Sequence, residues 1–165
     1  TTAALVMGDA LAIAALQARG FSEQDFARSH PGGVLGRRLL VYVEDIMRTG
    51  DELPCVSVKA SLADALIEMT RKGLGMTAVA GDDGRLAGMF TDGDLRRVLD
   101  AKVDISELSI SEVMTKSPMT VMPGLLAAEL VAMMRDRSIN GVIVLTEDRP
   151  VGALNMHDLL TAGII

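Results

Sequence analysis

The sequence predicts an α/β fold of two βαββα modules, related by a pseudo-twofold axis and packed sheet to sheet. Two observations lead to this expectation. The second part of the chain is duplicated, and each copy alternates between the hydrophobic spacing of strands and that of helices. Aromatic residues make up only 2% of the 165 residues, so Leu, Val, Ile, Met and Ala must fill the core.

The duplication is visible without any gap. Shifting residues 60–95 by 64 places gives nine identical pairs in thirty-six positions, where chance would give roughly three. Upstream, Val43-Glu44-Asp45-Ile46-Met47 matches Ile110-Ser111-Glu112-Val113-Met114. We therefore divide the chain into a leading segment and linker (1–40), a first module (41–103) and a second module (104–165).

In the first copy, a short extended piece over 55–58 leads to a helix that Ser61 and Asp64 can cap. Strands are expected over 76–80 and 86–90, joined by a turn at Asp83-Gly84, and a last helix over 91–99.

The second copy has the same plan. We expect an extended piece over 120–122, a helix from Gly124, strands over 142–145 and 151–154, and a helix over 155–162. Its turn over 147–150 is expected to be looser. The apolar face of its first helix would be formed by Leu126, Glu129, Leu130 and Met133, with Glu129 as a polar intrusion.

The leading segment predicts a helix over 3–19 that stops at Gly20, followed by a second helix start at Ser22. Residues 29–33 (Ser-His-Pro-Gly-Gly) interrupt regular structure. Because the chain opens within an apolar helical pattern and without Met, we expect it to be a piece of a longer protein.

Charge and composition exclude several classes. A net charge of −6 disfavours nucleic acid and anionic membrane as partners, and no apolar run approaches the roughly 20 residues that span a bilayer. With Cys55, His30 and His157 as the only cysteine and histidines, neither an internal disulfide nor a zinc site is expected. The cysteine content fits a reducing compartment, and we expect a cytoplasmic protein.

The candidate site is the start of the last helix in each copy. Thr91 falls at the N-cap with Asp94 three residues later, which is a capping box on the plain interpretation. On the functional interpretation, a ligand phosphate lies at the helix N-terminus and Asp94 accepts hydrogen bonds from ribose hydroxyls. Gly88 would let the strand pass close to the ligand.

The second copy keeps the carboxylate at Asp158 but has Asn155 in place of Thr91. Because an amide replaces the hydroxyl, the two sites should differ, and only one of them is expected to bind tightly. Arg97 could engage acidic groups of a ligand, or could simply be solvated.

The pattern Gly-x-x-[Thr/Asn]-x-x-Asp after the third strand of both copies resembles a tandem pair of CBS (cystathionine-β-synthase) domains over residues 43–163. The resemblance implies that adenosine or another nucleotide binds between the modules at Thr91, Asp94 and Asp158. Gly88, Thr91 and Asp94 match the motif, whereas Asn155 departs from it.

The leading segment, together with Thr91 to Arg97 (Thr-Asp-Gly-Asp-Leu-Arg-Arg), resembles the bacterial D-arabinose 5-phosphate isomerases, in which a sugar isomerase (SIS) domain precedes a CBS pair. The resemblance implies conversion of ribulose 5-phosphate to arabinose 5-phosphate for the lipopolysaccharide sugar Kdo, in a tetrameric parent enzyme. It places His30 in the active site. About forty residues cannot hold the sugar-binding domain, so we expect this chain to be catalytically incomplete.

We therefore expect a regulatory region that needs no cofactor and binds a small nucleotide or sugar nucleotide, such as CMP-Kdo or an adenine nucleotide. One alternative is a ligand-free module that dimerises and organises a homo-oligomer. Another is an enzyme in its own right that uses His30 or His157, although no neighbouring acid, base or nucleophile supports it.

Overall fold

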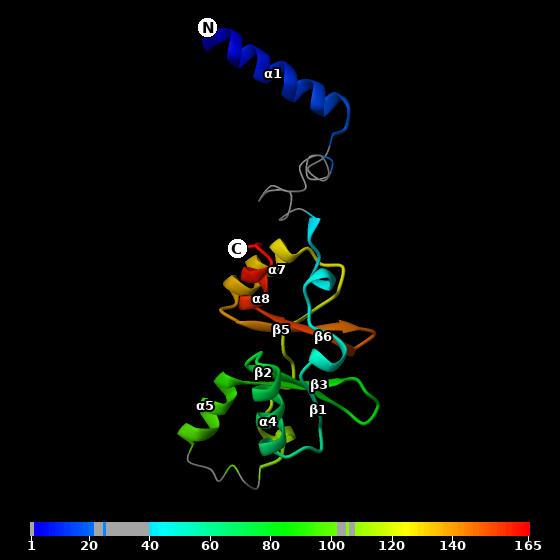
Figure 1. Ribbon diagram of the computed structural model, residues 1–165, viewed down its shortest axis with the longest axis vertical. Coiled ribbons are helices and arrows are strands. Elements are labelled where there is room, and N and C mark those ends of the chain that lie inside the picture. Colours follow the sequence, from blue (N-terminus) through cyan, green and yellow to red (C-terminus); the bar gives the residue numbers. More distant parts are fainter. Residues whose placement is uncertain (1, 22–24, 26–39, 102–104, 106–107) are drawn as a thin grey trace. The chain divides into compact units, whose positions relative to one another are not determined.

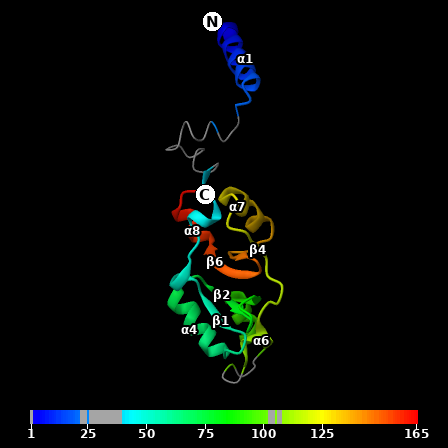
Figure 2. The same ribbon diagram turned by 90° about the vertical axis from the view of Figure 1, so that its right-hand side faces the viewer.

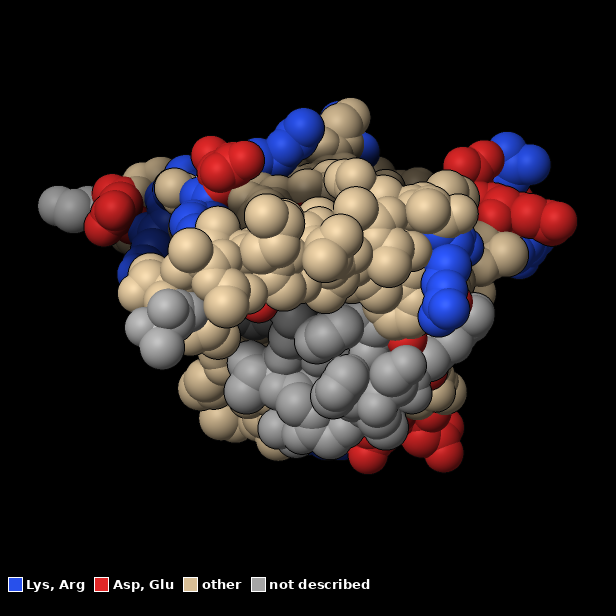
Figure 3. Space-filling model, turned by 90° about the horizontal axis from the view of Figure 1, so that it is seen from above, with Lys and Arg blue, Asp and Glu red and all other residues tan. Residues whose placement is uncertain are grey.

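The computed structural model describes residues 2–21, 25, 40–101, 105 and 108–165. The chain divides into two compact units, residues 1–40 and 41–165. In the first unit, α1 (Thr2–Ala18) ends two residues before Gly20, whose φ of +63° is the left-handed stop that the sequence predicts. None of the residues of α1 is buried, and Asp9 is its only charged residue (Figure 3). Ser22 and His30 lie outside the described residues.

The second unit contains two three-stranded sheets of the same topology (Figure 1). In each sheet the first strand pairs parallel with the second, and the second pairs antiparallel with the third. The strands are β1 (Cys55–Ser57), β2 (Met76–Ala80) and β3 (Leu86–Thr91) in one sheet, and β4 (Thr120–Val121), β5 (Gly141–Thr146) and β6 (Arg149–Asn155) in the other. The expected pair of βαββα modules is confirmed.

Helices cover the outer face of each sheet, and the inner faces meet (Figures 1 and 2). The helices are α4 (Leu62–Lys72), α5 (Asp92–Asp100) and α6 (Ile110–Val113) beside the first sheet, and α7 (Ala127–Asp136) and α8 (Met156–Thr161) beside the second. The two sheets share a buried cluster formed by Leu74, Met76, Ala78, Ile143 and Ala153. Within the described residues, no helix is long and apolar enough to cross a membrane.

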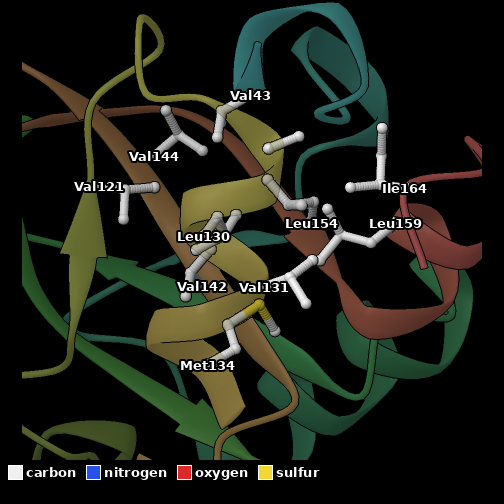
Figure 4. Packing of buried hydrophobic residues seen from close by; sticks show 11 residues of the cluster. Val43, Val121, Leu130, Val131, Met134, Val142, Val144, Leu154, Leu159 and Ile164 are labelled. Carbon is white, nitrogen blue, oxygen red and sulfur yellow. The ribbon is translucent and has the colours of Figure 1, made fainter. Parts of the chain in front are cut away.

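The segment that leads into each copy packs in the core of the other copy. Val43, in the 3-10 helix η1 (Val43–Asp45), is fully buried in the core of the second module (Figure 4), and its N–H donates to the Leu125 carbonyl at 2.9 Å. Ile110 of α6 is likewise fully buried beside Leu62 in the first module. After η1, a second 3-10 helix, η2 (Gly50–Glu52), leads to β1. The modules are therefore joined by a reciprocal exchange as well as by their sheets.

The two copies have the same structure, but the number of residues between corresponding positions changes along the chain. The N-caps of α4 and α7 are Ser61 and Leu126, which lie 65 residues apart, since 126 − 61 = 65. With this offset, the buried Leu62, Ala65 and Met69 correspond to Ala127, Leu130 and Met134, all of them buried. The expected polar intrusion at Glu129 was wrong: Glu129 is exposed, one position off the buried face.

The offset returns to 64 at the last helices because the second hairpin has a shorter turn. Thr146 pairs directly with Arg149, so only Glu147 and Asp148 form the turn, with φ of 51° and 64°. Two successive positive φ values are typical of a tight type I′ turn. The expectation of a looser turn here was wrong.

Candidate functional site

The last helix of each module begins with a capping box. Thr91 caps α5: its Oγ1 accepts from the Asp94 N–H at 3.2 Å, and the Thr91 N–H donates to Asp94 Oδ2 at 2.8 Å. Asn155 caps α8 in the same way, with both corresponding distances 3.0 Å. The capping interpretation of both motifs is confirmed.

A pocket of about 460 Å³ lies between these two helix starts. Its volume falls within the roughly 300–1,000 Å³ that small-molecule sites occupy. Repeat-related positions of both modules line it: Leu74, Gly75, Met76, Met89, Thr91, Asp92, Gly93 and Arg97 from the first, and Ser138, Ile139, Asn140, Gly141, Asn155, Met156 and His157 from the second. The structure therefore brings Thr91, Arg97 and Asn155 to one cavity.

Asp94 lies behind this wall and is only 4% exposed. Its Oδ2 accepts from Thr91 Oγ1 at 2.6 Å as well as from the Thr91 N–H. Its Oδ1 accepts from Thr115 Oγ1 at 3.2 Å and from Arg97, whose side chain is 70% exposed. A ligand hydroxyl could bind Asp94 only by replacing one of these hydrogen-bond partners. Arg97 is the easiest to replace, because most of its side chain is exposed to solvent.

Asp158 has a different partner. Its Oδ1 accepts from Arg48 Nε at 3.2 Å and from Arg48 Nη2 at 2.9 Å. A third bond runs from Arg48 Nη1 to the Lys72 carbonyl at 3.0 Å. In this half, a cation bridges the two modules and neutralises the carboxylate.

Gly88 and Gly152 lie where the exchanged segments cross the third strands. A Cβ on Gly88 would stand 2.7 Å from Met114 Sδ and 2.8 Å from the Thr115 carbonyl oxygen, and one on Gly152 would collide with Met47. The close approach that requires glycine at these positions is made by the protein's own backbone and methionines, and neither glycine lines the pocket between the modules.

Sequence reasoning missed Arg48 and Thr115, the two residues that reach the capping carboxylates from the other copy. The sequence did contain the information needed to find them. Arg48 and Thr115 directly follow Met47 and Met114, the last residues of the two matched upstream segments. Pairing these two positions with each other would have identified them as counterparts.

A larger hollow of about 880 Å³ lies within the second module alone, lined by residues 120–125, Met133 and residues 145–148. Its walls are mostly apolar, and its only charged groups are the carboxylates of Glu147 and Asp148, which would repel a phosphate. Because the pocket between the modules collects the capping side chains of both copies, we consider it the candidate site. Among the described residues, no cluster of His, Cys, Asp and Glu could hold a metal ion.

Comparison with known families gives two matches to the model of the CBS domain, at residues 43–101 and 110–164. These matches lie in both modules of the second unit and include Thr91, Asp94, Asn155 and Asp158. The chain belongs to the CBS-domain family.

The resemblance to arabinose 5-phosphate isomerases is also confirmed. The chain is 58% identical over its whole length to the arabinose 5-phosphate isomerases KdsD of Pseudomonas aeruginosa and of Escherichia coli. It covers 51% and 50% of those proteins, so it spans about half the length of the curated relatives it matches.

Several solved structures share this fold. Hypoxic Response Protein I with two coordinated zinc ions is 28% identical, with a TM-score of 0.63 over 73% of this chain and 98% of its own. CBSX2 in complex with AMP is 22% identical, with a TM-score of 0.65 over 74% and 96%. A CBS-domain pair in complex with 5′-methylthioadenosine and S-adenosyl-L-methionine is 20% identical, with a TM-score of 0.65 over 73% and 98%.

Proposed function

We propose that this CBS pair is the regulatory region of a cytoplasmic arabinose 5-phosphate isomerase and binds a nucleotide or sugar nucleotide between its modules. The observation that carries the proposal is the pocket of about 460 Å³ at which the capping side chains Thr91 and Asn155 converge from repeat-related helices. A ligand there touches both modules, so its binding energy can bias their relative arrangement.

Nucleotide chemistry suits the groups around this pocket. Thr91 offers a hydroxyl, Arg97 a guanidinium, and Met76, Met89 and Met156 an adaptable apolar surface for a base. The CBS pairs solved with AMP or with S-adenosyl-L-methionine support the class of ligand. Asp92, which also lines the pocket, disfavours a bare phosphate and favours a ligand that buries a sugar or base.

Two ligands of this class follow from the resemblances to the isomerases and to the CBS family. CMP-Kdo carries a cytidine ribose and lies downstream of arabinose 5-phosphate, which suits feedback regulation. An adenine nucleotide is what the CBS-family resemblance implies, and AMP, 5′-methylthioadenosine and S-adenosyl-L-methionine, bound in similar solved structures, all contain adenosine. In the parent enzyme we place His30 at the active site, where it would transfer a proton during isomerisation.

Titration calorimetry of the chain with AMP, ATP, S-adenosyl-L-methionine and CMP-Kdo tests the proposal. We expect at least one of them to bind, and we expect Gly93→Leu to abolish the binding. A Cβ on Gly93 meets only ordinary contacts, the nearest being Thr91 Oγ1 at 3.5 Å, so the variant should fold while its side chain fills the pocket.

The matched control is Gly124→Leu, because a Cβ at Gly124 meets nothing within 4 Å and this residue lies outside the pocket between the modules. This variant should bind as the native chain does. The proposal is wrong if none of the four compounds binds at millimolar concentration, or if both variants bind equally well.

A ligand-free assembly module is the second candidate, and a specific observation favours it. Both capping carboxylates already have protein partners, whereas Ile67, Leu99, Met122 and Leu160 each expose more than half of their area. On this hypothesis the pair forms homodimers through the exposed apolar residues. Light scattering of Ile67→Glu and Leu160→Glu variants would show a loss of the dimer, with no ligand response in any variant.

A further inference from the structure

The two halves of the site differ in the side chain that the exchanged segment delivers. In the first half-site (Thr91, Asp94 and Thr115), the Thr115 and Met89 backbones exchange two hydrogen bonds of 2.8 and 2.9 Å. In the second half-site (Asn155, Asp158 and Arg48), Arg48 and Ala153 do the same at 2.8 and 3.0 Å. Thr115 and Arg48 therefore occupy equivalent backbone positions, and each reaches Oδ1 of the local carboxylate.

The consequences for a ligand are opposite. A hydroxyl at 3.2 Å leaves the Asp94 charge available to an incoming donor. The other partner of Asp94 Oδ1 is Arg97, whose side chain is 70% exposed and has room to move away, although Asp94 itself is buried. Arg48 instead places a full positive charge on Asp158 through two hydrogen bonds. The side chains of Arg48 and Asp158 are only 28% and 14% exposed, so solvent screens this pair far less.

Arg48 is also held in place from the other module. Its Nη1 donates to the Lys72 carbonyl in the last turn of α4, an end at which the helix dipole favours a cation. Withdrawal of Arg48 from Asp158 would break this third bond as well. In addition, Asn155 Nδ2 donates to the Leu74 carbonyl at 3.5 Å. The N-cap residue of α8 is therefore also bonded to the first module.

From this asymmetry we infer that Arg48 acts as a built-in occupant of the second half-site, so that the chain binds one ribose-bearing ligand at the first half-site. This inference rests on the proposed function, because it specifies which half of the pocket the nucleotide uses. Arg97 is the group that moves aside: it releases Asp94 to the vicinal hydroxyls of the ribose and remains beside the ligand.

Calorimetric stoichiometry tests the inference, with AMP as the probe or, if AMP fails, whichever of the four compounds binds. We expect one ligand per native chain. The double variant Arg48→Thr/Asn155→Thr copies the first half-site into the second and should bind two. Two ligands on the native chain, or one on a folded double variant, would overturn the inference and leave the proposed function intact. Absence of binding by all four compounds would instead overturn the proposed function, and the inference with it.

A second comparison does not depend on the double variant folding. We expect Asp94→Asn to weaken binding by about tenfold or more, which is the loss of one charge-assisted interaction, and Asp158→Asn to change it less than about twofold. In spectra of methyl-labelled methionine, the ligand should shift Met114 beside the first half-site and leave Met47 beside the second unmoved. Equal effects of the two Asn substitutions, or a shift of Met47 alone, would contradict the inference.

Discussion

Arg48 and Asp158 lie 110 residues apart in the sequence and are joined by two hydrogen bonds, from Nε at 3.2 Å and from Nη2 at 2.9 Å. Through Arg48, Asp158 at the start of α8 is connected to the Lys72 carbonyl at the end of α4. The stability of the two modules is therefore coupled through one side chain, in addition to the apolar cluster between their sheets.

Replacement of Arg48 by Met should lower the free energy of unfolding by about 1–3 kcal/mol, because hydrogen bonds to a charged group are lost while Asp158 stays largely buried. Chemical denaturation followed by circular dichroism measures this. Arg71→Met is the control: Arg71 pairs with Glu68 at 2.9 Å, but its side chain is 66% exposed, so its loss should cost roughly 0–1 kcal/mol. Equal losses would show that Arg48 does not join the modules.

Gly88→Ala should destabilise the chain by about 1–3 kcal/mol, and by more than Gly152→Ala. The added methyl group on Gly88 meets the Thr115 carbonyl oxygen at 2.8 Å, and backbone cannot move aside. On Gly152 the main obstacle is the flexible Met47 side chain, and the nearest backbone oxygen, that of Arg48, is 3.2 Å away.

Thermal unfolding of the two variants measures this difference, with Gly124→Ala as the control that should leave the melting temperature nearly unchanged. A larger loss for Gly152→Ala than for Gly88→Ala would contradict the order that the backbone contacts impose.

The sequence could predict the plan of each module, but not contacts between the modules such as those that distinguish these two glycines. The duplication and the alternation of hydrophobic spacing were enough to predict both modules and the strands over 76–80 and 86–90. The sequence comparison used a constant offset of 64 residues between the two copies. The structure shows an offset of 65 residues over α7 and β5. The tight turn of the second hairpin was missed because its two residues with positive φ, Glu147 and Asp148, are not glycines. Glycine is the residue by which a sequence usually indicates such a turn.

The candidate site was predicted only as far as its local geometry. Capping boxes are formed by residues three positions apart, so Thr91 with Asp94 and Asn155 with Asp158 could be identified from the sequence. The partners that reach the two carboxylates from the opposite copy, Thr115 and Arg48, come from exchanged segments 21 and 110 residues away. The hydrophobic pattern of one copy cannot predict such a contact, because the contact depends on how the two modules pack against each other.

The Cys55 thiol should react slowly with iodoacetamide at neutral pH. Burial raises the pKa of Cys55, and the nearby Glu68 carboxylate raises it further, so the reactive thiolate forms only at higher pH. The alkylation rate measured against pH should show a midpoint above that of the same chain in denaturant. Glu68→Gln should move the midpoint down. A midpoint unchanged by unfolding would contradict this prediction.

The turn of the second hairpin is suited to stabilisation. Glu147 and Asp148 both adopt positive φ, which is unfavourable for residues with a Cβ and is the conformation that Asn-Gly prefers in type I′ turns. The double variant Glu147→Asn/Asp148→Gly should therefore raise the free energy of unfolding by about 0.5–1 kcal/mol. It removes the ion pair between Asp148 and Arg85 at 3.5 Å, but both side chains are more than 60% exposed, so this loss should be small.

The same change at Asp82 and Asp83 in the first hairpin provides the control, because positive φ occurs there at Gly84, which is already a glycine. Asp82→Asn/Asp83→Gly should not stabilise the chain, since Asp83 accepts a hydrogen bond from the Arg85 N–H at 3.0 Å and neither residue adopts positive φ. Denaturant titration of both double variants compares the turns. If the second-hairpin variant is no more stable than the native chain, backbone strain at residues 147 and 148 is not what limits this hairpin.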